Sequence, residues 1–99
     1  MLNIRKNADS GSLTVTLEGR LDTVTAPGLD EELKKSLDGV TDLIFDLEKL
    51  DYVSSAGLRV FLSTQKRMNT QGEMKVVRVN ETIMEIFDVT GFSDILTIE

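Results

Sequence analysis

A chain of 99 residues with 40% hydrophobic and 28% charged residues has the composition of one globular domain and not of a disordered tail. Its 17 acidic against 11 basic residues give a net charge of −6, and no basic stripe with interleaved aromatics appears, which argues against direct nucleic-acid binding. The absence of cysteine and histidine excludes disulfides, metal sites built on Cys or His, and a Ser-His-Asp triad.

Targeting and organisation are simple at the level of sequence. Residues 1–12 lack the apolar stretch of a signal peptide, and no apolar run approaches ~18 residues. We therefore expect no membrane insertion and a cytoplasmic location. No linker, repeat or low-complexity tract interrupts the chain, so a single domain over residues 1–99 is expected.

In the first part of the chain, the pattern predicts a hairpin followed by a helix. Residues 12–19 alternate apolar and polar side chains, which is typical of a half-buried strand, and a shorter alternation near the amino terminus predicts its hairpin partner. Residues 25–39 repeat leucine at every fourth position, which predicts a helix that Thr25 caps and Gly39 ends.

The remaining segments alternate between strand and helix patterns. They are a continuous apolar run at 42–47, a helical pattern from about 56 to 70, a strand at 74–79, a helix capped by Asn80 and closed by Gly91, and a final strand at 94–98.

The order β-β-α-β-α-β-α-β predicts an α/β fold. Strands that alternate with helices imply right-handed crossovers and parallel pairing, whereas the first strand is antiparallel as a hairpin partner. We expect one mixed, mostly parallel sheet of about five strands with three to four helices.

Two serines precede the second helix, in a loop expected at the carboxyl ends of the parallel strands, where open α/β sheets place their working surface. Spacing alone favours the common interpretation that Ser54 or Ser55 caps the helix. Gly57 in the first turn weakens that simple interpretation, because glycine costs helix stability unless something approaches the backbone closely.

Catalysis by these serines is not supported. The stretch SSAGL is not a G-x-S-x-G elbow, no base is evident, and no phosphate-binding glycine motif occurs anywhere in the chain. We therefore expect no enzyme activity, no catalytic residue, no cofactor and no metal site. A phosphoserine fits better, since a helix amino terminus tolerates the dianion and a kinase would supply the base.

A second loop, residues 19–28, brings Asp22 to the same edge of the sheet. The common interpretation of Asp22 is a solvated loop carboxylate, or a cap that helps the first helix. Asp22 and Asp46 are acidic residues in different segments, but two carboxylates at an unknown distance are only a weak indication of a metal site.

Three stretches of the chain carry a resemblance to a known family. They are GRLDTVTAPGL (19–29), DLIFDLEKLDYVSSAGLRVFL (42–62) and QGEMKVVRVNETIMEIFDVTGF (71–92). Together they resemble the STAS domain as found in bacterial anti-sigma factor antagonists, and the resemblance spans essentially the whole chain. It implies a partner-switching protein: the antagonist binds an anti-sigma factor serine kinase, is released when that kinase phosphorylates it, and is reset by a serine phosphatase.

The resemblance also implies roles for individual residues. Matching the family's glycine-leucine pair to Gly57-Leu58 places the acceptor serine on Ser55, and the aspartate of the G-x-L-D motif falls on Asp22. Many members have aspartate where this chain has Ser54, so Ser54 is the alternative acceptor. The expected partner-binding residues are Asp22, Thr23, Ser54, Gly57 and Arg59.

Other functions stay open at this stage. The main alternative is a STAS subunit that regulates a membrane transport system for anions or lipids, and an enzyme is the least supported option. A weak homodimer is also left open.

Overall fold

The elements of the protein are described from a computed structural model that covers residues 1–99. They are β1 (Leu2–Asp9), β2 (Ser12–Leu21), α1 (Ala26–Ser36), β3 (Asp42–Val53), α2 (Ser55–Gln71), β4 (Glu73–Val77), α3 (Glu81–Thr90) and a 3-10 helix, η1 (Phe92–Asp94). None of the helices combines the length and the hydropathy needed to cross a bilayer.

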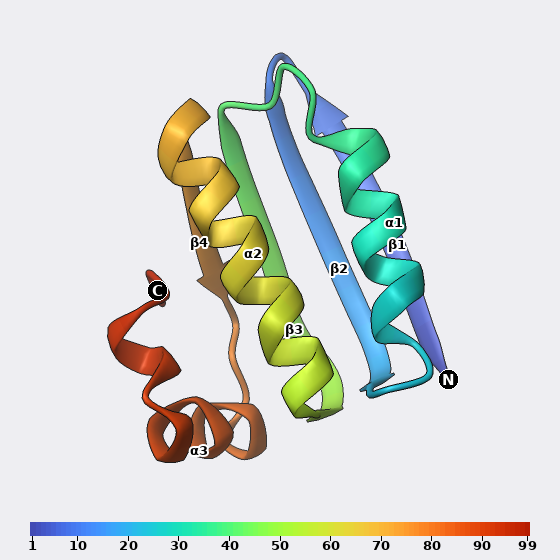
Figure 1. Cartoon of the computed structure of the whole chain (residues 1–99), viewed down its shortest axis with the longest axis vertical. Helices are drawn as coiled ribbons and strands as arrows, with labels where there is room; N and C mark the ends of the chain where they lie inside the picture. The colour runs from blue at the N-terminus through green and yellow to red at the C-terminus, as the bar shows by residue number, and fades with distance from the viewer.

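The strands form one mixed sheet in the order β1-β2-β3-β4. β1 pairs antiparallel with β2, and β2, β3 and β4 run parallel to one another. Figure 1 shows α1 in front of β1 and β2 and α2 in front of β3 and β4, so both helices cover the same face of the sheet. The predicted α/β fold and its mostly parallel sheet are therefore confirmed.

The fifth strand, predicted at 94–98, is wrong as a full strand. Residues up to Asp94 belong to η1, and the rest makes a single parallel bridge between Ile98 and Val76. The backbone N–H groups of Ile95 and Leu96 both donate to the Phe92 carbonyl, at 3.0 and 2.9 Å, so they close the 3-10 turn and are not available to a sheet ladder. Only the last residues reach β4, and the sheet has four strands.

The hydrophobic core lies between the sheet and the helices. Leu13, Val15 and Leu17 of β2 point into it, as the alternating pattern predicted, and the polar side chains between them face the other way. A chain of aromatic rings connects the layers: the Phe45 and Phe61 centroids are 5.2 Å apart, and those of Phe61 and Phe87 are 6.1 Å apart, both edge to face.

β3 is twice as long as the run of residues that predicted it, and its second half positions the site. Its pairing with β2 shifts register twice, and the buried residues change from every second position to every third, at Leu47, Leu50 and Val53. These irregularities are bulges, which add a residue while keeping the apolar side chains inward. The extension carries the start of α2 to the end of β2.

Candidate functional site

The two loops singled out in the sequence meet at the carboxyl ends of β2 and β3. The backbone N–H of Ser54 donates a 2.8 Å hydrogen bond to the carbonyl of Leu21, the last residue of β2. Asp22 follows Leu21 directly, so the structure brings the predicted acidic residue beside the paired serines.

The two adjacent serines have different environments. Ser54 is the N-cap of α2: its hydroxyl oxygen accepts from the Gly57 N–H at 3.4 Å, and its carbonyl accepts from Leu58 at 2.9 Å. Ser55 is the first helical residue, is exposed, and its side chain makes no hydrogen bond within the chain. Ser54 therefore takes the structural role, and the Ser55 hydroxyl is displayed to solvent.

The role of Gly57 differs from the predicted one. The sequence suggested that something approaches the backbone at this glycine, and the structure shows that Leu21 of the same chain does so. A Cβ built on Gly57 would lie 2.6 Å from Leu21 Cγ and 3.1 Å from the Leu21 carbonyl oxygen. Gly57 is buried. It holds the two loops together and is not open to direct contact by a partner, which corrects its assignment as a binding residue.

Asp22 organises its own loop. Its Oδ1 accepts hydrogen bonds from the backbone N–H groups of Val24 at 3.0 Å and Thr25 at 3.1 Å. The bond from the Thr25 backbone is the main reason that the pKa of the Asp22 carboxyl lies below its usual value, and desolvation opposes it. At neutral pH a carboxylate fixed in this way is a permanent negative charge beside the serines.

Thr25 does not cap α1 with its side chain, although it occupies the predicted position. Its hydroxyl donates to the Arg20 carbonyl at 2.8 Å and accepts from the Asp22 N–H at 2.9 Å, so it is committed to the loop. Among backbone N–H groups, the Asp22 carboxylate accepts only from those of Val24 and Thr25, which precede α1, so it orders the loop and does not cap the helix.

Several exposed side chains around the serines were missed by the sequence analysis. Val24 is 85% exposed, and Tyr52 is 36% exposed with the Arg20 guanidinium carbon 4.5 Å from its ring centroid. Tyrosine and arginine are enriched among residues that dominate binding energy at interfaces. A valine in an otherwise polar loop and the only tyrosine of the chain were the available signals.

A hollow of about 350 Å³ lies between the first turns of α1 and α2. Thr23 and Arg59, both predicted to contact a partner, line it from opposite sides and are exposed. Its other lining residues are Ala26, Pro27, Asp30, Ala56 and Val60. The hollow continues the surface that displays Ser55, since Ala56 and Arg59 follow Ser55 on α2.

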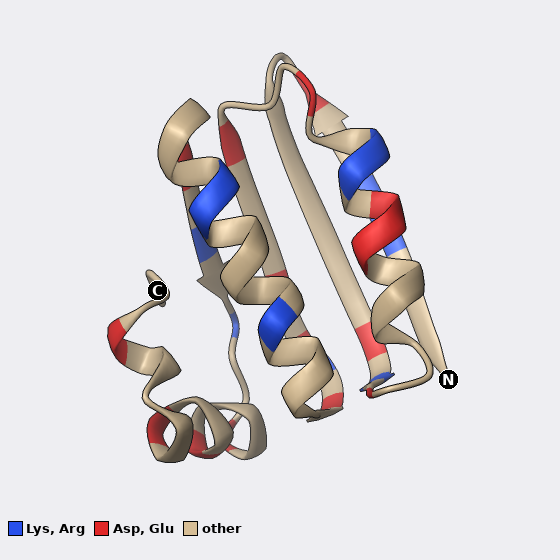
Figure 2. Cartoon of the chain, in the orientation of Figure 1, with Lys and Arg blue, Asp and Glu red and all other residues tan.

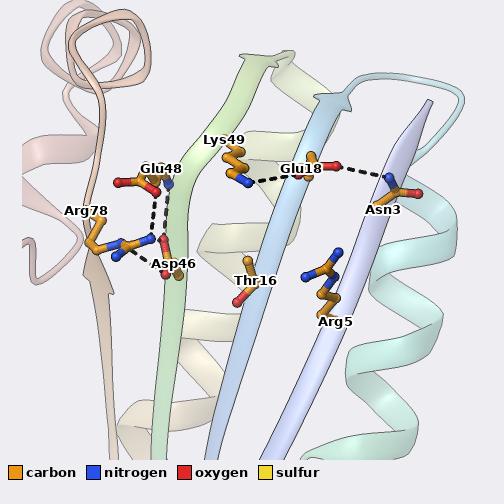
Figure 3. Close-up of a pocket in the computed structure, with 8 residues that line it drawn as sticks. All are labelled: Asn3, Arg5, Thr16, Glu18, Asp46, Glu48, Lys49 and Arg78. Carbon is orange, nitrogen blue, oxygen red and sulfur yellow. Dashed lines mark hydrogen bonds and ion pairs between the residues drawn. The ribbon is translucent and has the colours of Figure 1, made fainter.

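A second hollow, of about 240 Å³, opens on the face of the sheet that no helix covers (Figure 3). Its charges largely satisfy one another: Arg78 bonds Glu48 at 2.7 Å and Asp46 at 3.2 Å, and Lys49 lies 3.9 Å from Glu18. Arg78 has a positive φ of 54°, and its ion pairs tie the segment after β4 to β3. The ion pairs of this hollow therefore connect the strands and the segment after β4.

A family model described as the STAS domain matches residues 3–99, and the chain belongs to the STAS domain family. It is similar to the anti-sigma-B factor antagonist of Bacillus subtilis (strain 168), with 32% identity over 98 residues that cover 98% of this chain and 90% of that protein. The resemblance predicted from the sequence is thereby confirmed.

Solved structures agree on the fold. An anti-sigma factor antagonist from Mycobacterium paratuberculosis matches with a TM-score of 0.88 and 21% identity, covering 99% of this chain and 85% of that chain. Structures of SpoIIAA in its unphosphorylated form and of the Bacillus SpoIIAA in its phosphorylated form match with TM-scores of 0.77 and 0.76, each at 16% identity. Each match covers 98% of this chain, and they cover 87% and 91% of those chains, so each of the two structures shares the fold of this chain.

Proposed function

We propose that this protein is an anti-sigma factor antagonist that binds an anti-sigma factor serine kinase and is released when Ser55 is phosphorylated. The observation that carries the proposal is the division of labour between the two serines. Ser54 is engaged as the helix cap, whereas the Ser55 hydroxyl is exposed and free of hydrogen bonds. Relatives named as anti-sigma factor antagonists support the class of function.

The proposed switch needs no catalytic group on this chain. The kinase transfers the γ-phosphoryl group of ATP to Ser55 Oγ, the hydroxyl proton leaves, and ADP is the second product. A serine phosphatase hydrolyses the phosphate ester with water and restores the hydroxyl. The chain supplies a displayed oxygen and a surface that holds the kinase.

The surface around Ser55 combines apolar and charged contacts that suit a protein partner. Val24 and Tyr52 offer apolar area, Arg59 offers a cation at the hollow, and Asp22 offers a fixed anion. Thr23 is exposed at the edge of the same hollow. An interface of this kind excludes water and lowers the local dielectric, so attraction and repulsion between charges inside it are stronger than in solvent.

Phosphorylation would weaken such an interface through charge. It adds about −1.5 to −2 at pH 7, which takes the protein from −6 toward about −8 and concentrates the change beside Asp22. A buried, unpaired charge costs several kcal/mol. A loss of only ~2.8 kcal/mol lowers affinity about a hundredfold, which is enough to release the kinase.

The test combines phosphate mapping with binding. Incubation with ATP and the anti-sigma factor kinase of the same organism is expected to add one phosphate, mapped by mass spectrometry to Ser55. Ser55→Ala should abolish its uptake, and Ser54→Ala should preserve it. By calorimetry, Ser55→Ala should bind that kinase as tightly as the unmodified protein, and the phosphorylated protein at least tenfold more weakly. Phosphate on Ser54, or equal affinity of all forms, would overturn the proposal.

A further inference from the structure

Arg59 is one of the few basic side chains that have no charged partner. Eight of the 11 basic residues make an ion pair, and Arg5, Arg59 and Lys66 do not. Helix α2 contains no acidic residue, and Figure 2 shows only basic positions along it. Nothing on its own helix therefore neutralises Arg59, which leaves its guanidinium available.

The position of Arg59 directs it toward the acceptor serine. Arg59 follows Ser55 by four residues in the same helix, so both side chains lie on one face, one turn apart. Side chains in a helix lean toward its amino terminus, and a long side chain therefore covers the turn before its own Cα. For Arg59 that turn contains Ser55, and both residues are exposed.

The charged groups around Ser55 leave Arg59 as the free cation. Arg20 is held between the Tyr52 ring and Asp22, whose Oδ2 lies 3.8 Å from its Nε. Asp30 faces the hollow from α1 but is paired with Lys34 at 3.0 Å. Asp51 precedes the serines at the end of β3 and adds a negative charge to this edge.

We propose that Arg59 binds the Ser55 phosphate within the same chain. The inference rests on the proposed function of Ser55 and adds a second half to the switch. A guanidinium presents paired N–H donors that match phosphate oxygens, so the Ser55 phosphate can bind Arg59 in preference to water or a group of the partner protein. Arg59 also lines the hollow between α1 and α2, which belongs to the proposed partner-binding surface. When its guanidinium pairs with the phosphate, that positive charge is no longer available to a partner at the hollow. Because the phosphate carries about −1.5 to −2 at pH 7, a single guanidinium neutralises it only in part. A partner therefore still meets a net negative charge at Ser55, and it no longer finds the Arg59 cation in the hollow.

The test uses the full chain with phosphoserine encoded genetically at position 55, so that it does not depend on any kinase. Phosphorus-31 NMR follows the second ionisation of the phosphate. Arg59 favours the dianion, so Arg59→Ala should raise the pH midpoint by about 0.2–0.4 unit. The midpoint of Arg59→Lys should lie between those of the phosphorylated unmodified sequence and Arg59→Ala. Lys66→Ala is the control for loss of one positive charge from the same exposed helix surface.

A second readout observes the arginine itself. In proton–nitrogen spectra, the Arg59 Nε–H signal should shift on phosphorylation, and the Arg20 signal should not. An unchanged midpoint in Arg59→Ala, a shift as large in Lys66→Ala, or a response at Arg20 alone would overturn the inference. Phosphate mapped away from Ser55 by the kinase would instead count against the proposed function, and the two failures are therefore distinguishable.

Discussion

The contact between Leu21 and Gly57 determines how the acceptor serine is displayed. Leu21 is fully buried at the end of β2, and its side chain occupies the space that a Cβ on Gly57 would need. Two residues before Gly57, Ser55 lies on the exposed side of the same turn. The glycine thus allows the helix to start close to β2 while its outer side stays free for a partner.

Gly57→Ala should therefore destabilise the protein even though alanine favours helices. The new methyl group would meet Leu21 Cγ at 2.6 Å, and the buried leucine has little room to yield, so a loss of about 1–3 kcal/mol in unfolding free energy is expected. Gly28→Ala in α1 is the matched control, because nothing lies within 4 Å of its added Cβ, and a gain of up to about 1 kcal/mol is expected. Urea unfolding measures both. A gain in both variants would show that the Leu21 contact is not tight.

At the scale of elements, the Asn80 side chain bonds backbone carbonyls of β3 beyond the point where the pairing of β3 with β4 ends. β4 pairs with β3 only up to Asp46, so the second half of β3 has a neighbouring strand on one side only. The Asn80 amide nitrogen lies within hydrogen-bond distance of the carbonyls of Leu47, Glu48 and Leu50, at 3.2, 3.2 and 2.8 Å. Its oxygen caps α3 by accepting from Ile83 at 3.0 Å. One side chain thereby fixes α3 to the strand that leads to the serines.

Substitutions at Asn80 separate these two roles. Asn80→Asp keeps the cap oxygen but replaces the donor with a negative charge facing carbonyl oxygens, so a loss of about 1–3 kcal/mol in unfolding free energy is expected. Asn80→Ala removes both the donor and the cap but adds no charge, so its loss of about 1–3 kcal/mol measures the two contacts together. Asn7→Asp on exposed β1 is the control and should change stability by less than about 0.5 kcal/mol. Denaturant midpoints decide it, and an Asn80→Asp variant as stable as the unmodified protein would mean that the carbonyl contacts add nothing.

The sequence predicted those elements whose periodicity is regular. β2 has an apolar spacing of two, the three helices have spacings of about four, and the first part of β3 is a continuous apolar run; each is found in the structure. The rest of β3 was missed because its bulges space Leu47, Leu50 and Val53 by three, which neither template describes. The last strand was overestimated because its few β-branched residues cannot reveal that a 3-10 turn comes first.

For the candidate site too, the sequence predicted the features that depend on local patterns and missed those that depend on how distant segments meet. The sequence located both loops, because turn residues and helix starts are local signals. It did not decide between Ser54 and Ser55 as the cap, since that depends on where β3 ends against Leu21. The exposed Val24 and the stacking of Arg20 on Tyr52 also depend on the way that distant strands end side by side.

At the scale of the whole molecule, two carboxylates stabilise the amino-terminal half: Glu32 joins α1 to β1, and Asp22 orders the loop between β2 and α1. Lys6 on β1 donates to Glu32 on α1 at 2.7 Å, and this bond is the main cause of the lowered pKa of Glu32. Asp22 has a lowered pKa because of the Thr25 N–H in the loop between β2 and α1. Both contacts hold the amino-terminal half together, and both require the ionised form.

The pH dependence of stability follows from the direction of these pKa values. Both folded pKa values lie below the unfolded values of about 3.9 for Asp and about 4.3 for Glu, so their stabilisation is fully present above those values and is lost as the pH falls through the folded ones. The double variant Asp22→Asn/Glu32→Gln should thus unfold at lower urea than the unmodified protein near pH 7, and the difference should shrink progressively below about pH 4. Glu31→Gln, which removes a carboxylate paired only with Lys35 on the same helix, is the control for altered net charge. A difference that stays constant from neutral to acidic pH would show that these variants act through packing and not through the two ionised carboxylates.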